Sequence, residues 1–195
     1  TAVGKDALTS NATGTDNVAV GKDALLANTA SNNVAVGVDA LTANTSGDCN
    51  VAVGKSNSDS ITTGCANTSI GGQSFNTATT SDFSVAVGFR SLASTTTANN
   101  NVAVGACSLN ANTTGTNNVA VGNNSLKTQT TAEGNTAIGS DTLCTVTSSA
   151  GGNTAVGQKA LEDDTTGFYN TAVGSLSLCQ NTTGAYNVAI GREAL

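Results

Sequence analysis

The chain repeats itself, and the period of the repeat constrains the fold more than any other feature of the sequence. The stretch from Asn17 to Leu41 reads NVAVGKDALLANTASNNVAVGVDAL, so nearly the same segment occurs twice in succession. The asparagine that opens this motif recurs at spacings of 16 to 18 residues, most often 17. A pair of helices needs more than about thirty residues, so this short period predicts a stack of short β elements.

We number the repeat from this asparagine, which takes repeat position 0. Position 4 is Gly and position 3 is Val or Ile in all twelve copies, while position 8 is Leu in ten. Position 2 is Ala in every copy except one, where it is Ser69. The two copies without Leu at position 8 have Ser58 and Phe75 there. Because the repeat covers residues 1–195, we expect one continuous array of about 11.5 coils that forms a segment of a longer fibre.

The NVAVG motif alternates, and Val, Ile and Thr favour a pleated strand, which predicts a short strand at positions 1 to 3. A second short strand is expected at positions 7 to 12. Glycines at position 14, such as Gly47 and Gly115, are expected in turns with positive φ. The predicted fold class is therefore all-β, a repeat β-solenoid with about 17 residues and two short strands per coil. At a coil spacing of roughly 4.8 Å, the rod would be on the order of 55 Å long.

Stacked coils place equal repeat positions above one another, so each recurring residue becomes a ladder. Asn at position 0 is expected to pass hydrogen bonds from coil to coil. Gly at position 4 implies a left-handed backbone or the close approach of another backbone. Val or Ile at position 3 and Leu at position 8 would form apolar columns. The ladders are represented by Asn17, Asn33, Asn50, Asn101 and Asn118, by Gly21, Gly37, Gly54, Gly105 and Gly122, by Val20, Val36 and Val53, and by Leu25, Leu41 and Leu109.

The apolar columns leave two arrangements open. A thin coil lined by Ala and Gly has little room for Val and Leu, so the columns would pack against two other chains in a homotrimer, which the sequence favours. Alternatively, a single-chain solenoid keeps both columns inside. End-to-end association of copies into a longer array is a further way for the chain to partner itself.

The motif N-V-A-V-G-x-x-[AS]-L resembles the head repeats of the YadA-like trimeric autotransporter adhesins, and also the repeat arrays of phage and virus tail fibres. The resemblance covers the whole chain, although the adhesin repeat is a few residues shorter in the turn that reads NTTG here. It implies a left-handed parallel β-roll in which three chains associate side by side. It also implies an extracellular fibre or adhesin on a cell or virion surface, which supports attachment to a cell-surface receptor or a glycan.

Charge and composition argue against several other classes of function. The net charge is −6 with only seven Lys and Arg, whereas a nucleic-acid partner requires a basic surface. Apolar runs are only a few residues long, so no membrane insertion is expected. The chain has no His, which is the commonest general base, and its carboxylates at position 6, such as Asp23 and Asp39, fall in separate coils. We therefore expect no enzyme activity and no metal or cofactor.

Three further features carry expectations. Cys49 at position 16 and Cys65 at position 15 of the next coil fall within reach of each other, which predicts a disulfide, with free thiols as the alternative. A column of Thr at position 12 raises ice binding as an alternative function. An ice-binding face needs two outward Thr residues separated by one inward residue, whereas Thr at the neighbouring positions 12 and 13 would point in opposite directions on a strand. The alternative interpretation of the Thr column is a ladder of turn-forming residues. The bulky departures from the repeat are candidate surface contacts: Phe75, Phe83, Phe89, Phe168, Tyr169 and Tyr186.

Overall fold

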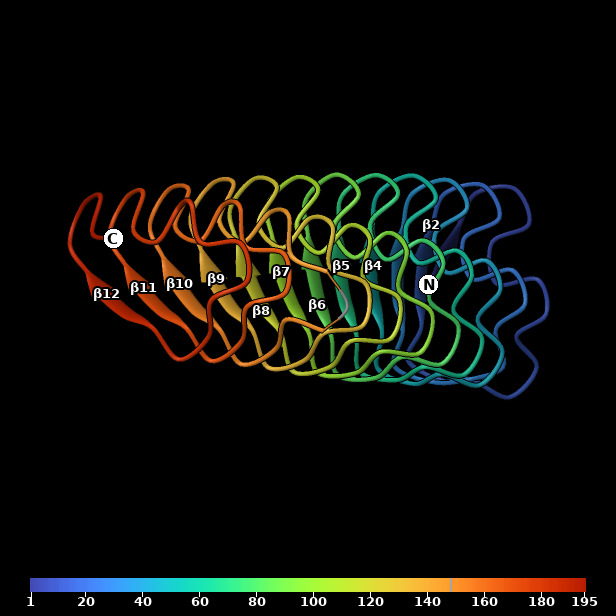
Figure 1. Cartoon of the computed structure of the whole chain (residues 1–195). Coiled ribbons are helices and arrows are strands. Elements are labelled where there is room, and N and C mark those ends of the chain that lie inside the picture. The colour runs from blue at the N-terminus through green and yellow to red at the C-terminus, as the bar shows by residue number, and fades with distance from the viewer. Residues whose placement is uncertain (148) are drawn as a thin grey trace.

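The computed structural model describes residues 1–147 and 149–195, and it is a parallel β-solenoid of about 17 residues per coil (Figure 1). The strands form one sheet in which neighbours follow the order of the chain. The coils stack from the N-terminus to the C-terminus, so the two termini lie at opposite ends of the rod. The strands are β1 (Ala2–Val3), β2 (Val18–Val20), β3 (Val34–Val36), β4 (Val51–Val53), β5 (Thr68–Ile70), β6 (Val85–Val87), β7 (Val102–Val104), β8 (Val119–Val121), β9 (Thr136–Ile138), β10 (Thr154–Val156), β11 (Thr171–Val173) and β12 (Val188–Ile190).

Each strand pairs with the next at equal repeat positions, even where the spacing of the repeat changes. Val18 pairs with Val34 across a 16-residue coil, and Thr136 pairs with Thr154 across an 18-residue coil. A shift of one residue would turn the buried Ala at position 2 outward and the Val or Ile at position 3 inward. The sheet register is therefore kept, and the turns absorb the missing or additional residue.

The predicted second strand at positions 7 to 12 is wrong. In the described residues each coil has a single strand, and the chain from position 5 to position 10 consists of turns. Positions 6 and 8 explain the difference, because Asp23 and Leu25 have φ of 58° and 51°. Such left-handed residues bend the chain and cannot continue a pleated strand. A third bend of this kind occurs at position 16, for example at Asn32 with φ of 61°.

A leucine in the left-handed region is unfavourable, and burial compensates for it. The backbone conformation costs roughly 1–2 kcal/mol for a residue with a Cβ. Burying a Leu side chain contributes about 1.5–3 kcal/mol. Leu25, Leu41 and Leu109 are all completely buried in these bends. The bend therefore serves to direct the side chain into the centre of the coil.

The turn glycines at position 14 do not have the positive φ that we expected of them. Gly47 and Gly115 are outside the left-handed region, but a Cβ added to Gly47 would lie 2.2 Å from the carbonyl oxygen of Gly64 in the next coil. At position 4 both proposed reasons apply. Gly21 has φ of +137°, and a Cβ there would lie 2.3 Å from the Gly37 carbonyl oxygen. Close contact between coils is thus the requirement that the two positions share.

The Val and Leu columns lie on opposite sides of the coil wall. Ala19 at position 2 and Leu25 at position 8 are both 0% exposed and belong to the core that runs through the stack. Val20 at position 3 points away from the core and is 37% exposed. Val36 and Val53 are also only partly buried. Neither sequence-based arrangement was right for both columns, because the Leu column fills the single chain and the Val column faces outward.

The exceptions to the repeat compensate one another inside the core. Ser58 replaces Leu at position 8, and Ser69 replaces Ala at position 2 of the following coil. Their hydroxyl oxygens are 2.7 Å apart, and both hydroxyls bond to the Oδ1 atom of Asn57. Phe75, the next residue in the position 8 column, is buried and supplies additional apolar volume beside this small polar cluster. The buried polar groups are therefore paired, as stability requires.

Candidate functional site

The asparagines at position 0 join each coil to the next through the backbone. The Nδ2 of Asn33 donates to the Gly47 carbonyl of its own coil at 2.9 Å, and its Oδ1 accepts the Asn50 N–H at 2.8 Å. Asn118 N–H likewise donates to Asn101 Oδ1 at 3.0 Å. Each side chain thereby satisfies two backbone groups that the coil interior hides from water. The asparagines Asn17, Asn33, Asn50, Asn101 and Asn118 are all buried.

A second internal polar column, which was not predicted from the sequence, occurs at position 11. Asn44 Nδ2 donates to the Gly47 carbonyl at 2.9 Å, and Gly47 N–H donates back to Asn44 Oδ1 at 3.2 Å. The same Gly47 carbonyl also accepts the bond from Asn33, so both of its lone pairs are used. The recurrence of Asn at position 11 in five of the copies was the signal that could have revealed this column.

Asp164 occupies position 11 of its coil and is completely buried. Its Oδ1 accepts the Gly167 N–H at 2.9 Å, as the amide oxygen of Asn44 does for Gly47. Its Oδ2 takes the place of the amide nitrogen, and it has no hydrogen-bond partner among the described residues. Burial raises the pKa of Asp164 to about 6, and the hydrogen bond from Gly167 opposes the shift only in part.

The Thr column at position 12 uses its hydroxyl groups to connect coils. Thr45 Oγ1 donates to the Thr62 carbonyl at 3.0 Å, and Thr113 Oγ1 donates to the Thr130 carbonyl at 3.0 Å. These hydroxyl protons are therefore directed along the rod. This geometry agrees with the ladder interpretation of the column.

All five cysteines are free, so the predicted bond between Cys49 and Cys65 is not formed. The register shows why, because equal positions stack on each other. Asp48 N–H points to Cys65 Sγ at 3.4 Å, and Ala66, which is the residue equivalent to Cys49, donates its N–H to the Asp48 carbonyl. Cys65 thus stacks on Asp48. Burial and the nearby Glu162 raise the pKa of the Cys144 thiol.

The outer side of the sheet is a continuous surface of Val, Ile and Thr from positions 1 and 3, which we call the sheet face. Position 1 residues such as Val34 and Thr68 are partly buried, while Ile70 at position 3 is 42% exposed. Because adjacent strands pair in register, these side chains form two parallel columns along the rod. The sheet face is a regular apolar surface that the repeat itself produces.

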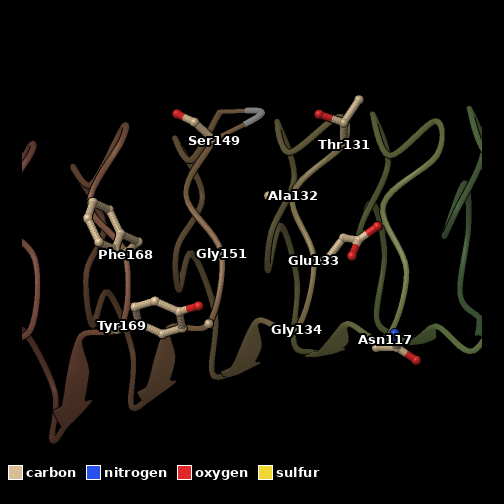
Figure 2. Close-up of a pocket in the computed structure, with 10 residues that line it drawn as sticks. Asn117, Thr131, Ala132, Glu133, Gly134, Ser149, Gly151, Phe168 and Tyr169 are labelled. Atoms are coloured by element: carbon tan, nitrogen blue, oxygen red, sulfur yellow. The ribbon is translucent and has the colours of Figure 1, made fainter.

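A groove interrupts the side of the rod formed by positions 14 to 16 (Figure 2). It has a volume of about 570 Å³, and its lining includes Glu133, Gly134, Gly151 and Tyr169. Position 16 is glycine at Gly134 and Gly152, so the column of position 16 side chains is interrupted over these two coils. Phe168, Tyr169 and Tyr186 pack on one another at one end, with ring centroids 5.2–5.7 Å apart.

The aromatic residues thus divide into different environments. Phe75 is buried in the core, and Phe83 and Phe89 stand exposed and singly on the surface. Only Phe168, Tyr169 and Tyr186 gather beside a groove. Nothing in the sequence indicated the groove itself, although two glycine-bearing copies followed by a Phe-Tyr pair were visible.

The carboxylates at position 6 make local contacts in exposed turns. Asp6 lies 3.3 Å from Lys5, and Asp23 lies 2.6 Å from Lys22. Exposed pairs of this kind contribute little to stability. The described part of the chain contains no group of three or more His, Cys, Asp or Glu residues that could hold a metal ion. Residues 1–147 and 149–195 also contain no helix of the length and apolar character needed to cross a membrane.

Comparison of the chain with protein-family models, with curated proteins and with solved structures gave no match. The solenoid, its sheet face and its groove are therefore the features that bear on function.

Proposed function

We propose that this chain is a non-enzymatic structural segment of an extended extracellular fibre, which holds or presents an attachment surface on a cell or virion. In this proposal each chain is a left-handed β-roll, and three chains associate side by side. The sheet face is the single observation that carries the proposal. Regular stacking adds length without requiring a new core, because each coil is the template for the next.

The sheet face has the apolar composition expected of a contact between chains. The twelve strands of the described residues, at a spacing of roughly 4.8 Å, make it about 53 Å long, and two residue columns make it on the order of 10 Å wide. The resulting area of roughly 500 Å² lies in the upper part of the range for the largest apolar patch of a monomer. Val20, Ile70, Ile138 and Val173, all at position 3, are 37–42% exposed along its length. Burial of these side chains against two other copies would stabilise a trimer.

The test is the mass of the particle in solution, measured by light scattering behind a sizing column. We expect three times the chain mass of 19.0 kDa. Val104→Lys places a charge on the sheet face and should convert the particle to single chains. The matched control, Thr114→Lys, places the same charge at an exposed position 13 and should leave the trimer intact. A wild-type particle with the mass of one chain would refute the association.

The same measurement separates end-to-end assembly from the trimer. Among the described strands, the outer edges of β1 and β12 have no neighbour in the sheet. Free edges of this kind can pair with another copy. A mass that continues to grow beyond three chains as the protein concentration rises would indicate a self-assembling filament.

One observation favours ice binding as a second candidate function, on the sheet face and not on the Thr column at position 12. Positions 1 and 3 are two outward residues separated by one inward residue, and position 1 is Thr in four of the described strands, β5, β9, β10 and β11. Regular ranks of small Thr and Val side chains along a sheet suit the repeat of an ice surface. This candidate requires single chains that show thermal hysteresis, so a trimer without hysteresis contradicts it.

A further inference from the structure

Along the side of the rod that carries the groove, a regular hydrogen bond of the solenoid comes to an end. In the first half of the rod, the N–H at position 15 donates to the position 15 side chain of the next coil. Ser31 N–H donates to Asp48 Oδ1 at 2.7 Å, and Cys65 N–H donates to Asp82 Oδ1 at 2.7 Å. Asp82 N–H then donates to Asn99 Oδ1 at 2.8 Å, which is the last bond of this series in the described residues. In these coils a polar side-chain atom at position 15 accepts this backbone donor: a carboxylate or amide oxygen in three bonds, and the Ser31 hydroxyl or the Cys65 sulfur in the other two.

Further along the rod, N–H groups at position 15 have no side-chain acceptor in the next coil among the described residues, and two of these N–H groups lie at the groove. The residue above Glu133 at position 15 is Gly151, and the residue above Gly151 is Phe168, as the bonds from Gly152 to Glu133 and from Tyr169 to Gly151 show. Neither Gly151 nor Phe168 has a side-chain oxygen. Within residues 1–147 and 149–195, neither Glu133 N–H nor Gly151 N–H has an acceptor. The groove is thus lined by two backbone donors, about one coil spacing of roughly 4.8 Å apart.

A rigid aromatic ring stands beside these donors. The ring of Tyr169 lies over Gly152, where an added Cβ would be 2.4 Å from the ring atom Cδ1. Phe168 packs edge-on against Tyr169 with centroids 5.7 Å apart, and Tyr186 packs against both rings, 5.6 Å from Tyr169 and 5.2 Å from Phe168. Tyr169 is nevertheless 60% exposed. In Figure 2 the Tyr169 ring lies on the groove side of the rod, nearer the sheet than Gly151. The neighbours fix the ring and leave part of it open to a ligand.

The charges around the groove select the kind of acceptor that would complete it. Glu133 presents a carboxylate at the groove, and the chain has a net charge of −6. Both disfavour an anionic ligand. A neutral carbonyl oxygen, by contrast, can accept the free N–H groups without repulsion, and neighbouring hydroxyl groups can donate to Glu133 and to the Asn117 side chain. The ligand chemistry that fits is a neutral carbonyl beside a ring with one apolar face and a polar edge.

We propose that this groove binds an N-acetylated amino sugar unit of a glycan. The acetamido carbonyl accepts the N–H of Gly151 or Glu133, in place of the missing oxygen at position 15. The apolar C–H face of the sugar ring and the acetamido methyl pack against Tyr169. The sugar hydroxyls donate to the Glu133 carboxylate. The proposal deepens the attachment role given above and rests on it for its biological context.

The test is titration of the ¹⁵N-labelled protein with tri-N-acetylchitotriose, followed through the amide resonances. We expect the Glu133 and Gly151 amide protons to shift downfield on binding. Cellotriose, which has the same linkage and no acetamido group, should bind at least about tenfold more weakly. Tyr169→Ala should weaken binding of the acetylated sugar by at least about tenfold. Phe83→Ala is the matched control, because Phe83 is an exposed aromatic residue at the same position 16 far from the groove.

Several results would overturn the proposal. These are equal binding of the two sugars, unchanged binding in Tyr169→Ala, or no shift of the Glu133 and Gly151 amides with either sugar. Amide spectra of the variants, unchanged outside the groove, establish that they fold. The particle mass is measured on the same samples, so a trimer that does not bind sugar refutes only this proposal. A monomer that binds sugar refutes only the association.

Discussion

Replacing Asp164 by Asn should stabilise the solenoid at neutral pH, because the buried carboxylate must ionise at a position where five other copies place an asparagine amide. Its pKa is raised from an ordinary value of 3.8 to about 6. A shift of this size corresponds to about 3 kcal/mol between the two protonation states. The pKa of Asp164 is higher in the folded chain than in the unfolded chain. The contribution of its neutral carboxyl group to folding stability is therefore fully present below about pH 4, and it is lost as the pH rises through about 6. The introduced amide group would also donate to the Gly167 carbonyl, as Asn44 does to Gly47.

The measurement is the free energy of unfolding in urea, followed by circular dichroism at equal protein concentration for the wild type and the variant. We expect Asp164→Asn to be more stable by about 2–4 kcal/mol at pH 7.5, and the difference to shrink below about 1 kcal/mol at pH 4. Other carboxylates titrate in both proteins and cancel in this comparison. Asp163→Asn, at the exposed neighbouring position, is the control and should change stability by less than about 0.5 kcal/mol at either pH. A destabilised Asp164→Asn, or a gain that does not depend on pH, would refute the reasoning.

Three other substitutions test the contacts between coils, each by the urea midpoint. Gly105→Ala should lower the free energy of unfolding by at least about 2 kcal/mol, because φ is +131° and the new Cβ would lie 2.4 Å from the Gly122 carbonyl oxygen. The control Lys22→Ala changes a surface residue and should leave the midpoint nearly unchanged. Leu109→Ala should cost about 2–5 kcal/mol through the cavity it leaves, and a loss under about 1 kcal/mol would mean that the coil collapses around it. Asn118→Ala removes the acceptor of the buried Asn135 N–H and should cost about 2–4 kcal/mol, so an unchanged midpoint would contradict the ladder's role.

Much of the solenoid could be predicted because its constraints are local and repeated. The period set the coil length, the alternation of NVAVG identified the strand, and glycine in every copy of position 4 indicated that something approaches closely there. The left-handed bends were missed because Asp23 and Leu25 are ordinary residues for other conformations. Leu has no preference for a positive φ, and although Asp adopts one more often than most residues, only the need to close the coil imposes it at both positions.

The groove and the buried carboxylate were missed for a related reason. Each is a small departure from the repeat whose meaning depends on what stacks above it. Gly151 is one of many glycines until its neighbour Glu133 is seen to lack a hydrogen-bond acceptor. Asp164 is one of thirteen acidic residues until its coil encloses it. Likewise, Cys49 and Cys65 looked close by position, but the stacking of equal positions brought each beside a different residue.

The sequence by itself determined that the chain is an array of equal β coils, because a hydrophobic and glycine pattern with a period of about 17 residues admits few other structures. The tertiary structure decided how each coil is bent, and therefore which side of its wall each apolar column occupies. Leu25 lies inside and Val20 outside because a left-handed bend turns one inward while the pleat turns the other outward. A side chain's direction depends on backbone angles that the whole coil must satisfy together, and these angles are not encoded residue by residue.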